Sequence, residues 1–317
     1  MDRENSIRGG ATRTTLKDQF GRPVDSLRIS VTYKCNYKCI FCHSEGVLTP
    51  RMKADVFTAD DYGFIAKVLS SYGVKYYKLT GGEPLLREDI HDIVAAIKPY
   101  AEEISLVTNG SLLLEKAKLL AEAGLDRINV SLHALKKDVY EYITGGAKLL
   151  EKVLAGIDEA LKYGLKVKVN FLLLKSNLED LPRVLDFAES KGINVNIIEL
   201  VPLGVPRDVY EKEHVPLSEV VYLVEERSIR KQYREFQNRP VYVLRSGIRV
   251  EFVMGFMNRF LCAGCTRIRL TSDGCFKTCL YLEQPVVCIA DVVKRRDGEG
   301  LAELFKNTVK LRKPFFT

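Results

Sequence analysis

The sequence predicts an α/β fold: an incomplete (β/α)6 barrel of the TIM type, followed by a smaller C-terminal module. Two observations support this prediction. Strand-like and helix-like segments alternate from residue 27 to residue 201, and in several of the strand-like segments apolar and polar side chains alternate. Repeated strand–helix units imply parallel strands with right-handed crossovers. The chain of 317 residues is long enough for such a domain and an appended module.

The predicted strands and helices follow one another in regular order. We expect strands at 27–33, 74–80, 104–108, 127–133, 165–173 and 193–201. We expect helices at 58–71, 88–100, 112–123, 149–163 and 178–191.

The side-chain alternation within the strands indicates a curled sheet. Fully buried parallel strands usually read as continuous apolar runs. In 27–32, 128–133 and 167–171, however, apolar residues alternate with polar ones. Helices must cover the apolar face, so we expect the polar face to line a concave interior that holds a polar ligand. The length fits about six units better than a closed barrel of eight.

A run of prolines and glycine at 201–206 marks a boundary. We therefore expect an N-terminal extension at 1–26, the partial barrel at 27–206 and the C-terminal module at 207–317. Within the module we expect a charged helical stretch at 207–237, a hairpin at 242–252 and a terminal helix at 301–310.

Composition narrows the class of protein. The 48 basic and 41 acidic residues give a net charge of +7, a mild excess that does not call for nucleic acid. The N-terminus has no apolar signal region and no long apolar run occurs, so we expect a cytoplasmic protein without a membrane partner. In such a compartment stable disulfides are rare, and the eight cysteines favour metal or catalytic roles. Cys275 and Cys288 lie outside two spaced groups, and we expect Cys288 to be a small buried apolar residue.

The first cysteine group lies just after the first predicted strand. Cys35, Cys39 and Cys42 are separated by three and then two residues. An iron–sulfur cube normally takes four thiolates, so three of them leave one iron open to bind another molecule. A zinc site or chance clustering is the alternative, although a fourth ligand is missing.

This loop resembles the signature of the radical S-adenosylmethionine (SAM) superfamily. The resemblance implies a 4Fe-4S cluster whose open iron chelates SAM and reduces it to a 5'-deoxyadenosyl radical. It also implies that Phe41 contacts the adenine. The turn Thr80-Gly-Gly-Glu-Pro84 resembles the motif whose backbone near Gly82 approaches the methionine part of SAM, and Ser131 is placed like a SAM-contacting serine. An ordinary tight turn and an ordinary strand serine are the alternatives.

The second cysteine group comprises Cys262, Cys265 and Cys279. With Cys275, the same segment has the spacing of a four-cysteine zinc site, and that alternative stays open on spacing alone. The run that begins at Cys265 closely resembles the C-terminal motif of the GTP 3',8-cyclase family. The resemblance implies a second 4Fe-4S cluster, again with three cysteine ligands, whose open iron binds guanine. The C-terminal module is therefore expected to be an iron–sulfur module.

A triphosphate requires several converging cations. Arg28, Lys78 and Lys168 lie on the predicted polar strand faces. They resemble the family's GTP-binding residues, as do Thr108 and the run Arg267, Ile268 and Arg269. The resemblance also makes Arg267 and Arg269 candidates for aiding the later radical steps.

The sequence also departs from the family pattern. Many members carry an arginine and a methionine where this chain has Asn196 and Val201. We therefore expect that one triphosphate contact is either missing or replaced from elsewhere in the chain, with Arg207 as a candidate. The common C-terminal Gly-Gly tail is absent as well.

The family implies conversion of GTP to (8S)-3',8-cyclo-7,8-dihydroguanosine 5'-triphosphate, the first step of molybdenum cofactor biosynthesis. The implied partners are GTP, a reductant such as ferredoxin or flavodoxin, and the next enzyme, cyclic pyranopterin monophosphate synthase; the chain is expected to be a monomer or homodimer. Two alternatives remain. One is another two-cluster radical SAM enzyme, such as a peptide-modifying maturase. The other is a non-catalytic metal protein.

Overall fold

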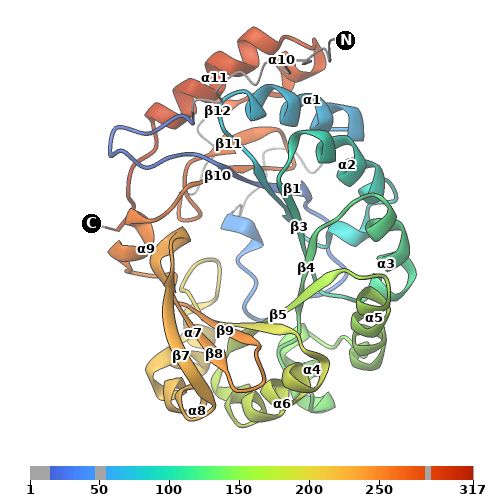
Figure 1. The fold of residues 1–317 in the computed structure, drawn as a ribbon, viewed down its shortest axis with the longest axis vertical. Coiled ribbons are helices and arrows are strands. Elements are labelled where there is room, and N and C mark those ends of the chain that lie inside the picture. The colour runs from blue at the N-terminus through green and yellow to red at the C-terminus, as the bar shows by residue number, and fades with distance from the viewer. Residues whose placement is uncertain (1–14, 47–54, 283–286, 317) are drawn as a thin grey trace, which may run out of the picture.

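The computed structural model describes residues 15–46, 55–282 and 287–316. Within these residues one sheet contains twelve strands, in the order β12-β11-β10-β1-β2-β3-β4-β5-β6-β9-β8-β7. From β10 through β1 to β6 and on to β9, every neighbouring pair is parallel. The sheet curls around a central space, with helices on its outside and its end strands β12 and β7 unjoined (Figure 1). The prediction of an incomplete barrel is therefore confirmed.

All six predicted barrel strands are present, with bounds that differ from the predicted ones by a few residues at most. They are β1 Ser26–Thr32, β2 Tyr76–Gly81, β3 Glu103–Thr108, β4 Arg127–Ser131, β5 Lys166–Leu173 and β6 Asn194–Glu199. The alternation in β1 has the predicted effect. Leu27, Ile29 and Val31 are buried beneath the helices, whereas Arg28 faces a cavity on the other side.

The five predicted barrel helices are also confirmed. They are α1 Ala59–Ser70, α2 Ile90–Ile97, α3 Leu113–Glu122, α5 Leu150–Lys162 and α6 Leu181–Lys191. An additional helix, α4 Lys137–Thr144, lies between β4 and α5. It is short and polar, but it buries Tyr140 and Ile143 and ends at Gly145 in the left-handed conformation. Among the described residues, no helix is long and apolar enough to cross a membrane.

Residues beyond 206 extend the same sheet at both ends. β9 Arg249–Val253 pairs with β6, and β10 Arg267–Leu270 pairs with β1. The other elements of this part are α7 Arg207–Glu213, α8 Val221–Glu225, β7 Ser228–Arg234, β8 Arg239–Leu244, α9 Arg259–Ala263, β11 Cys275–Lys277, β12 Val287–Cys288, α10 Ala290–Lys294 and α11 Gly298–Lys310. The predicted hairpin and terminal helix are confirmed as β8–β9 and α11.

The predicted helical stretch at 207–237 is only partly correct. Its first half forms α7 and α8, but from residue 228 the chain is a strand. β7 pairs antiparallel with β8 at the end of the sheet, where most of its charged side chains are exposed. Hydrogen bonding to β8 therefore overrides the local pattern, and charged side chains are common on such edge strands.

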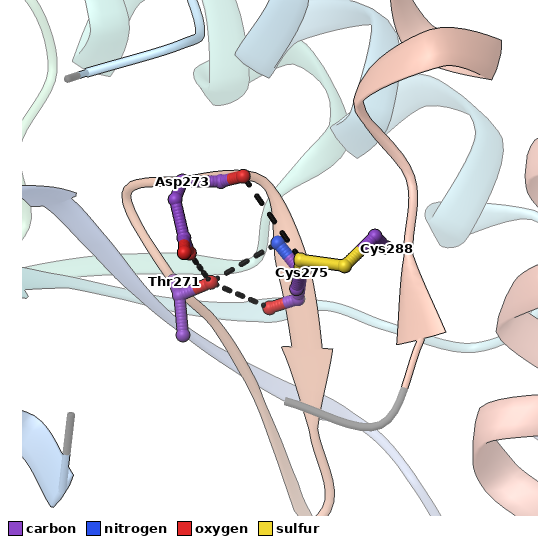
Figure 2. Close-up of a disulfide and its surroundings, with 4 residues drawn as sticks. All are labelled: Thr271, Asp273, Cys275 and Cys288. Carbon is purple, nitrogen blue, oxygen red and sulfur yellow. Dashed lines mark hydrogen bonds between the residues drawn. A yellow bond between two sulfur atoms is a disulfide. The ribbon is translucent and has the colours of Figure 1, made fainter. Parts of the chain in front are cut away.

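Cys275 and Cys288 form a disulfide (Figure 2). The pairing of β11 with β12 places the two residues directly opposite each other. The turn before β11 is also held, because the backbone N–H of Cys275 donates to Thr271 Oγ1 at 3.0 Å. The expectation of a small buried apolar residue at position 288 is therefore wrong, since Cys288 is exposed and covalently bonded. Because Cys275 is part of this disulfide, it cannot be the fourth ligand of the zinc site that the cysteine spacing left open.

Candidate active site

The polar face of the sheet lines a cavity of about 390 Å³. All six free cysteines, Cys35, Cys39, Cys42, Cys262, Cys265 and Cys279, line this cavity. The volume lies within the range of small-ligand sites, about 300–1,000 Å³. Two cysteine groups that are more than two hundred residues apart in sequence thus face one cavity.

The first cysteine loop is held in place by the end of α4. The backbone N–H groups of Lys38 and Ile40 donate to the carbonyls of Thr144 and Ile143 at 3.3 and 3.1 Å. Burial raises the pKa of Cys35, and it raises the pKa of Cys39 to about 12. Such thiols ionise more readily when a metal cation is bound, because the cation offsets the cost of desolvating the thiolate.

The Gly-Gly turn after β2 packs tightly against the cysteine loop. The N–H of Gly82 donates to Thr32 O at 2.9 Å, and the N–H of Glu83 donates to Lys34 O at 2.7 Å. A Cβ at residue 82 would overlap the Lys34 carbonyl, so only glycine permits this approach.

Glu83 and Thr108 form a unit at this end of the cavity. Glu83 accepts hydrogen bonds from Thr108 Oγ1 and from the N–H groups of Asn109 and Leu85, at 2.7, 2.7 and 2.9 Å. Burial outweighs these bonds and raises the pKa of Glu83 to about 7. The Thr108 hydroxyl also accepts from Gly110 N–H at 2.9 Å, so it serves first to hold Glu83.

Phe41 and Ser131 line the cavity, as the resemblance implies for SAM-contacting residues. The Phe41 ring meets the His133 ring edge-to-face, with ring centroids 4.8 Å apart. Burial lowers the pKa of His133 to about 3, and its Nδ1 accepts the Leu172 N–H at 3.0 Å. The imidazole is therefore neutral with its proton on Nε2, and it fixes the Phe41 ring.

Glu45 lies between two cations of the candidate triphosphate site. Arg28 and Arg269 are direct neighbours on the parallel strands β1 and β10, where like charges repel. Arg28 Nε donates to Glu45 Oε2 at 2.8 Å, and Arg269 Nη1 donates to the same oxygen at 2.7 Å. Burial disfavours the Glu45 carboxylate, but both arginines outweigh it and hold the pKa well below its usual value. Sequence reasoning missed this residue, although it lies only three positions after Cys42.

Lys78 and Arg267 also line the cavity. Burial, together with neighbouring arginines, holds the pKa of each well below its usual value. Arg267 lies over the Phe236 ring at 4.8 Å, and its buried Nε has no hydrogen-bond partner within the described parts of the chain. Both groups would gain stability from a bound anion. The side chain of Ile268 points the other way into the hydrophobic core, so only its backbone can contact a substrate.

Lys168 differs from the other candidate cations, because it does not line the cavity in the described part of the chain. Its Nζ donates to Glu251 Oε2 at 2.7 Å. Burial lowers the pKa of Lys168 to about 8 even beside this carboxylate. Arg239 on β8 bonds the other oxygen of Glu251 at 3.0 Å and does line the cavity. Arg239 is therefore a further cation at the site that sequence reasoning missed.

Arg207 does not replace the family arginine missing at position 196. Its side chain is 91% exposed on α7 and pairs with Glu211, so this expectation is wrong. Asn196 does line the cavity, and it donates to Asn170 Oδ1 at 2.8 Å, as Asn129 does at 3.3 Å. The Oδ1 atoms of Asn196 and Asn129 are buried and accept no hydrogen bond from any described residue. The side chains of these three asparagines therefore form a neutral hydrogen-bonded row where many family members carry an arginine.

The second cysteine group is surrounded by arginines. Cys262 and Cys265 lie at the end of α9, and Cys279 follows β11. Burial disfavours the Cys265 thiolate, but Arg312, Arg267 and Arg22 outweigh it and lower its pKa. Burial raises the pKa of Cys279.

The free thiols at the cavity are compatible with iron–sulfur ligation. The described residues hold no compact group of three His, Cys, Asp or Glu side chains placed for a single ion. Each cysteine group offers three free thiols to the cavity, and the second is matched by buried positive charge. The thiolates that hold an iron–sulfur cluster bind different irons, so they do not have to converge on a single ion.

Comparisons with known proteins agree with this arrangement. The family model of the radical SAM superfamily matches residues 29–188, and the model of Molybdenum Cofactor Synthesis C matches residues 193–317. The chain is 41% identical over 307 residues to a probable GTP 3',8-cyclase of Saccharolobus islandicus, which covers 94% of this chain and 98% of the relative. It is 42% identical over 311 residues to a probable GTP 3',8-cyclase of Thermococcus kodakarensis, which covers 95% and 99%.

A solved structure shows the same fold at low identity. SuiB of Streptococcus suis, bound to S-adenosylmethionine, aligns with a TM-score of 0.64 and 16% identity over 89% of this chain and 68% of SuiB. That likeness concerns the fold alone, whereas the identity to the cyclases extends over nearly the whole chain. The chain therefore belongs to the radical SAM superfamily and, within it, to the family of the GTP 3',8-cyclases.

Proposed function

We propose that this protein is a GTP 3',8-cyclase, a lyase that converts GTP to (8S)-3',8-cyclo-7,8-dihydroguanosine 5'-triphosphate in the first step of molybdenum cofactor biosynthesis. One observation carries the proposal: two groups of three free thiols and a set of buried cations all face one cavity. The identity of 41–42% to probable GTP 3',8-cyclases supports the same substrate.

The first cluster is assigned to Cys35, Cys39 and Cys42, and the second to Cys262, Cys265 and Cys279. When bound, the first cluster and SAM supply the one-electron source and the carbon radical that removes the ribose C3' hydrogen of GTP. Phe41, the backbone near Gly82, and Ser131 hold SAM beside this cluster. The segment 207–317 contributes the second cluster and much of the substrate site to the barrel of 27–206.

The chain's own contribution to the reaction is to position GTP. Arg28, Lys78, Arg267 and Arg269 bind the triphosphate in a cavity where water screens charge weakly. Arg239 adds a cation next to them. Holding C3' close to the radical source and C8 close to C3' lowers the entropy cost of ring closure. Arg267 and Arg269 also stabilise charge on the nucleotide during the later steps.

Lys168 and Thr108 have supporting roles in this proposal. Lys168 binds Glu251 and holds Arg239 through it, so it reaches a phosphate only if Glu251 releases it. Thr108 holds Glu83 beside the SAM site.

The reductant is a small electron carrier such as ferredoxin or flavodoxin, and the next enzyme is cyclic pyranopterin monophosphate synthase. The expected compartment is the cytoplasm, where six free thiols are usual and the Cys275–Cys288 disulfide is unusual.

The test is anaerobic turnover of the reconstituted chain with SAM, dithionite and GTP. We expect deoxyadenosine and a cyclised nucleotide in equal amounts.

Lys78→Gln removes one charge from the phosphate site and should lower GTP turnover at least about tenfold, since a charged hydrogen bond contributes about 1.5–3 kcal/mol. The control is Arg207→Gln on the exposed face of α7, which should retain wild-type turnover.

Two outcomes would contradict the proposal. One is deoxyadenosine that is no higher with GTP than without it. The other is deoxyadenosine that rises with added peptides instead of GTP, which would favour a peptide-modifying enzyme of the same fold.

A further inference from the structure

Two buried arginines lie directly behind the second cysteine group. Arg22 Nη1 donates to the carbonyl of Cys262 at 2.8 Å, and Arg312 Nη2 donates to the carbonyl of Cys265. Arg22 precedes β1 and Arg312 follows α11, so they come from opposite ends of the described chain. Together they hold the two backbone carbonyls next to the candidate cluster ligands.

Asp18 joins the two arginines. Its Oδ2 accepts from Arg22 Nε at 2.8 Å and from Arg312 Nη1 at 3.1 Å. The three side chains are almost fully buried, with exposed fractions of 0%, 8% and 1% for Asp18, Arg22 and Arg312. Two guanidinium groups share one carboxylate, so this buried triad carries a net positive charge.

One donor of the triad has no hydrogen-bond partner among the residues that the structure describes. Arg22 Nη2 is buried without a hydrogen bond, and Arg22 lines the cavity next to Cys262 and Cys265. A buried charged donor that makes no hydrogen bond is destabilising. The position of Nη2 therefore favours an acceptor on the cavity side, and a cluster held by thiolates, with its bridging sulfides, is such an acceptor.

The chain around Arg22 is built to fix this side chain. The N–H groups of Phe20 and Arg22 donate to Asp18 Oδ1 at 2.9 and 3.0 Å, which forms a tight turn with Gly21 in the left-handed conformation. Arg312 also donates to the carbonyls of Arg22 and Pro23, at 3.2 and 3.3 Å. Hydrogen bonds thus hold both the backbone and the side chain of Arg22, which fixes the position of its guanidinium group.

We propose that Arg22 and Arg312, joined by Asp18, are positioning residues of the second cluster that raise its reduction potential. Arg22 Nη2 donates a hydrogen bond to a sulfur of that cluster, and the net positive charge of the triad stabilises its reduced form. Hydrogen bonds to the sulfurs and nearby charge are both known determinants of such potentials. This inference rests on the proposed second cluster.

The test is a redox titration of the reconstituted chain, followed by electron paramagnetic resonance. It is made in the full chain with both clusters and again in a full chain with Cys35→Ala, Cys39→Ala and Cys42→Ala, in which only the second cluster can assemble. Arg22→Gln should make the reduction potential of the second cluster more negative by about 59 mV. This shift corresponds to a tenfold change in the equilibrium constant of a one-electron reduction. The first potential should not move.

Two matched variants complete the test. Arg22→Lys keeps the charge and should keep most of the potential. Arg207→Gln removes an exposed arginine that is not among the lining residues of the cavity and should change neither cluster. Arg22→Gln could fail to assemble the second cluster, and Arg22→Lys then distinguishes the two explanations. Assembly of the cluster in Arg22→Lys with a near-wild-type potential supports the proposal. Failure of Arg22→Lys to assemble the cluster overturns the proposal.

Other outcomes overturn the inference without affecting the proposed function. An unchanged second potential in Arg22→Gln means that the charge does not tune the cluster. An unchanged potential together with a raised KM for GTP means that Nη2 contacts the substrate instead. A wild-type chain that binds iron for only one cluster contradicts the proposed function itself.

Discussion

The two cysteine groups line the same cavity but are built in different ways. The first is one short loop after β1. Glu83, a carboxyl group with a raised pKa, follows the neighbouring strand β2. The second is divided between α9 and the end of β11, and arginines from distant parts of the chain surround it. Burial raises the pKa of Cys35 and Cys39, whereas arginines lower that of Cys265.

This difference shows how the cavity is polarised. A neutral His133 and a Glu83 with a pKa of about 7 lie near the first group. Arg312, Arg267 and Arg22 lie near the second group and lower the pKa of Cys265. We propose that a highly charged nucleotide binds near the second group and that SAM binds near the first. The predictions below test this division.

The largest effect is expected from removing one ligand of each group. Cys42→Ala should abolish SAM cleavage, because the SAM-binding cluster is lost. Cys265→Ala should abolish GTP cyclisation but leave a slow SAM cleavage that GTP no longer stimulates. Each variant should lose about half of the iron. Deoxyadenosine is measured with and without GTP. Equal loss of SAM cleavage in both variants would contradict the division.

The disulfide should matter for the second end only. Cys288→Ser opens a link across thirteen residues and should lower the free energy of unfolding by about 3 kcal/mol. Chemical denaturation measures this change, and SAM cleavage without GTP is the control, since it should not change. Alkylation of both cysteines in the untreated wild-type chain would show that the link is absent.

Gly82→Ala tests the packing at the first end. The new Cβ overlaps the Lys34 carbonyl, so the turn or the cysteine loop must shift, at a cost of about 1–3 kcal/mol. SAM binding should weaken more than GTP binding. Gly298→Ala at the start of α11 is the control, because a Cβ there makes only ordinary contacts. Equal affinities for SAM in the two variants would argue against a specific role of residue 82.

The last expected effect is a pH dependence of stability that has opposite signs for Glu45 and Glu83. The pKa of Glu45 is held below its usual 4.5, so its contribution to stability is present above 4.5 and is lost as the pH falls toward the folded value. The pKa of Glu83 is raised to about 7, so its contribution is present below 4.5 and is lost as the pH rises from 4.5 to 7.

These signs can be read from unfolding measured between pH 4 and pH 8. Glu83→Gln should remove a decline of at most about 1.4 kcal/mol per pH unit between pH 4.5 and 7. Glu45→Gln should lower stability at pH 7 and less so at acidic pH. Identical pH slopes in the wild type and both variants would contradict the assignment.

Much of the barrel and of the first end could be predicted from local patterns. Strand alternation in β1 and β5 indicated which face is polar, because side chains on a strand point to opposite faces. The helix α4 and strand β7 could not be predicted in the same way. α4 is short and polar, and β7 is a strand only because β8 lies beside it.

The predicted site residues show the same limit. Arg28, Lys78, Arg267 and Arg269 line the cavity, but Lys168 is bound by Glu251 from β9, eighty-three residues away. Sequence spacing indicates on which face a lysine lies, but it does not reveal a carboxylate on another strand. Arg22 and Glu45 were missed for the same reason, since each gains its role from a partner more than two hundred residues away.

The sequence by itself determined the spacing of both cysteine groups, the Gly-Gly turn and the polar inner face of the strands, since each depends on residues that are close along the chain. Only the tertiary structure decided that the two groups share one cavity, that Cys275 is bonded to Cys288, and that Glu45 lies between Arg28 and Arg269. The physical reason is that burial and electrostatic pairing depend on which strands become neighbours, and β10 becomes the neighbour of β1 only when the sheet has formed.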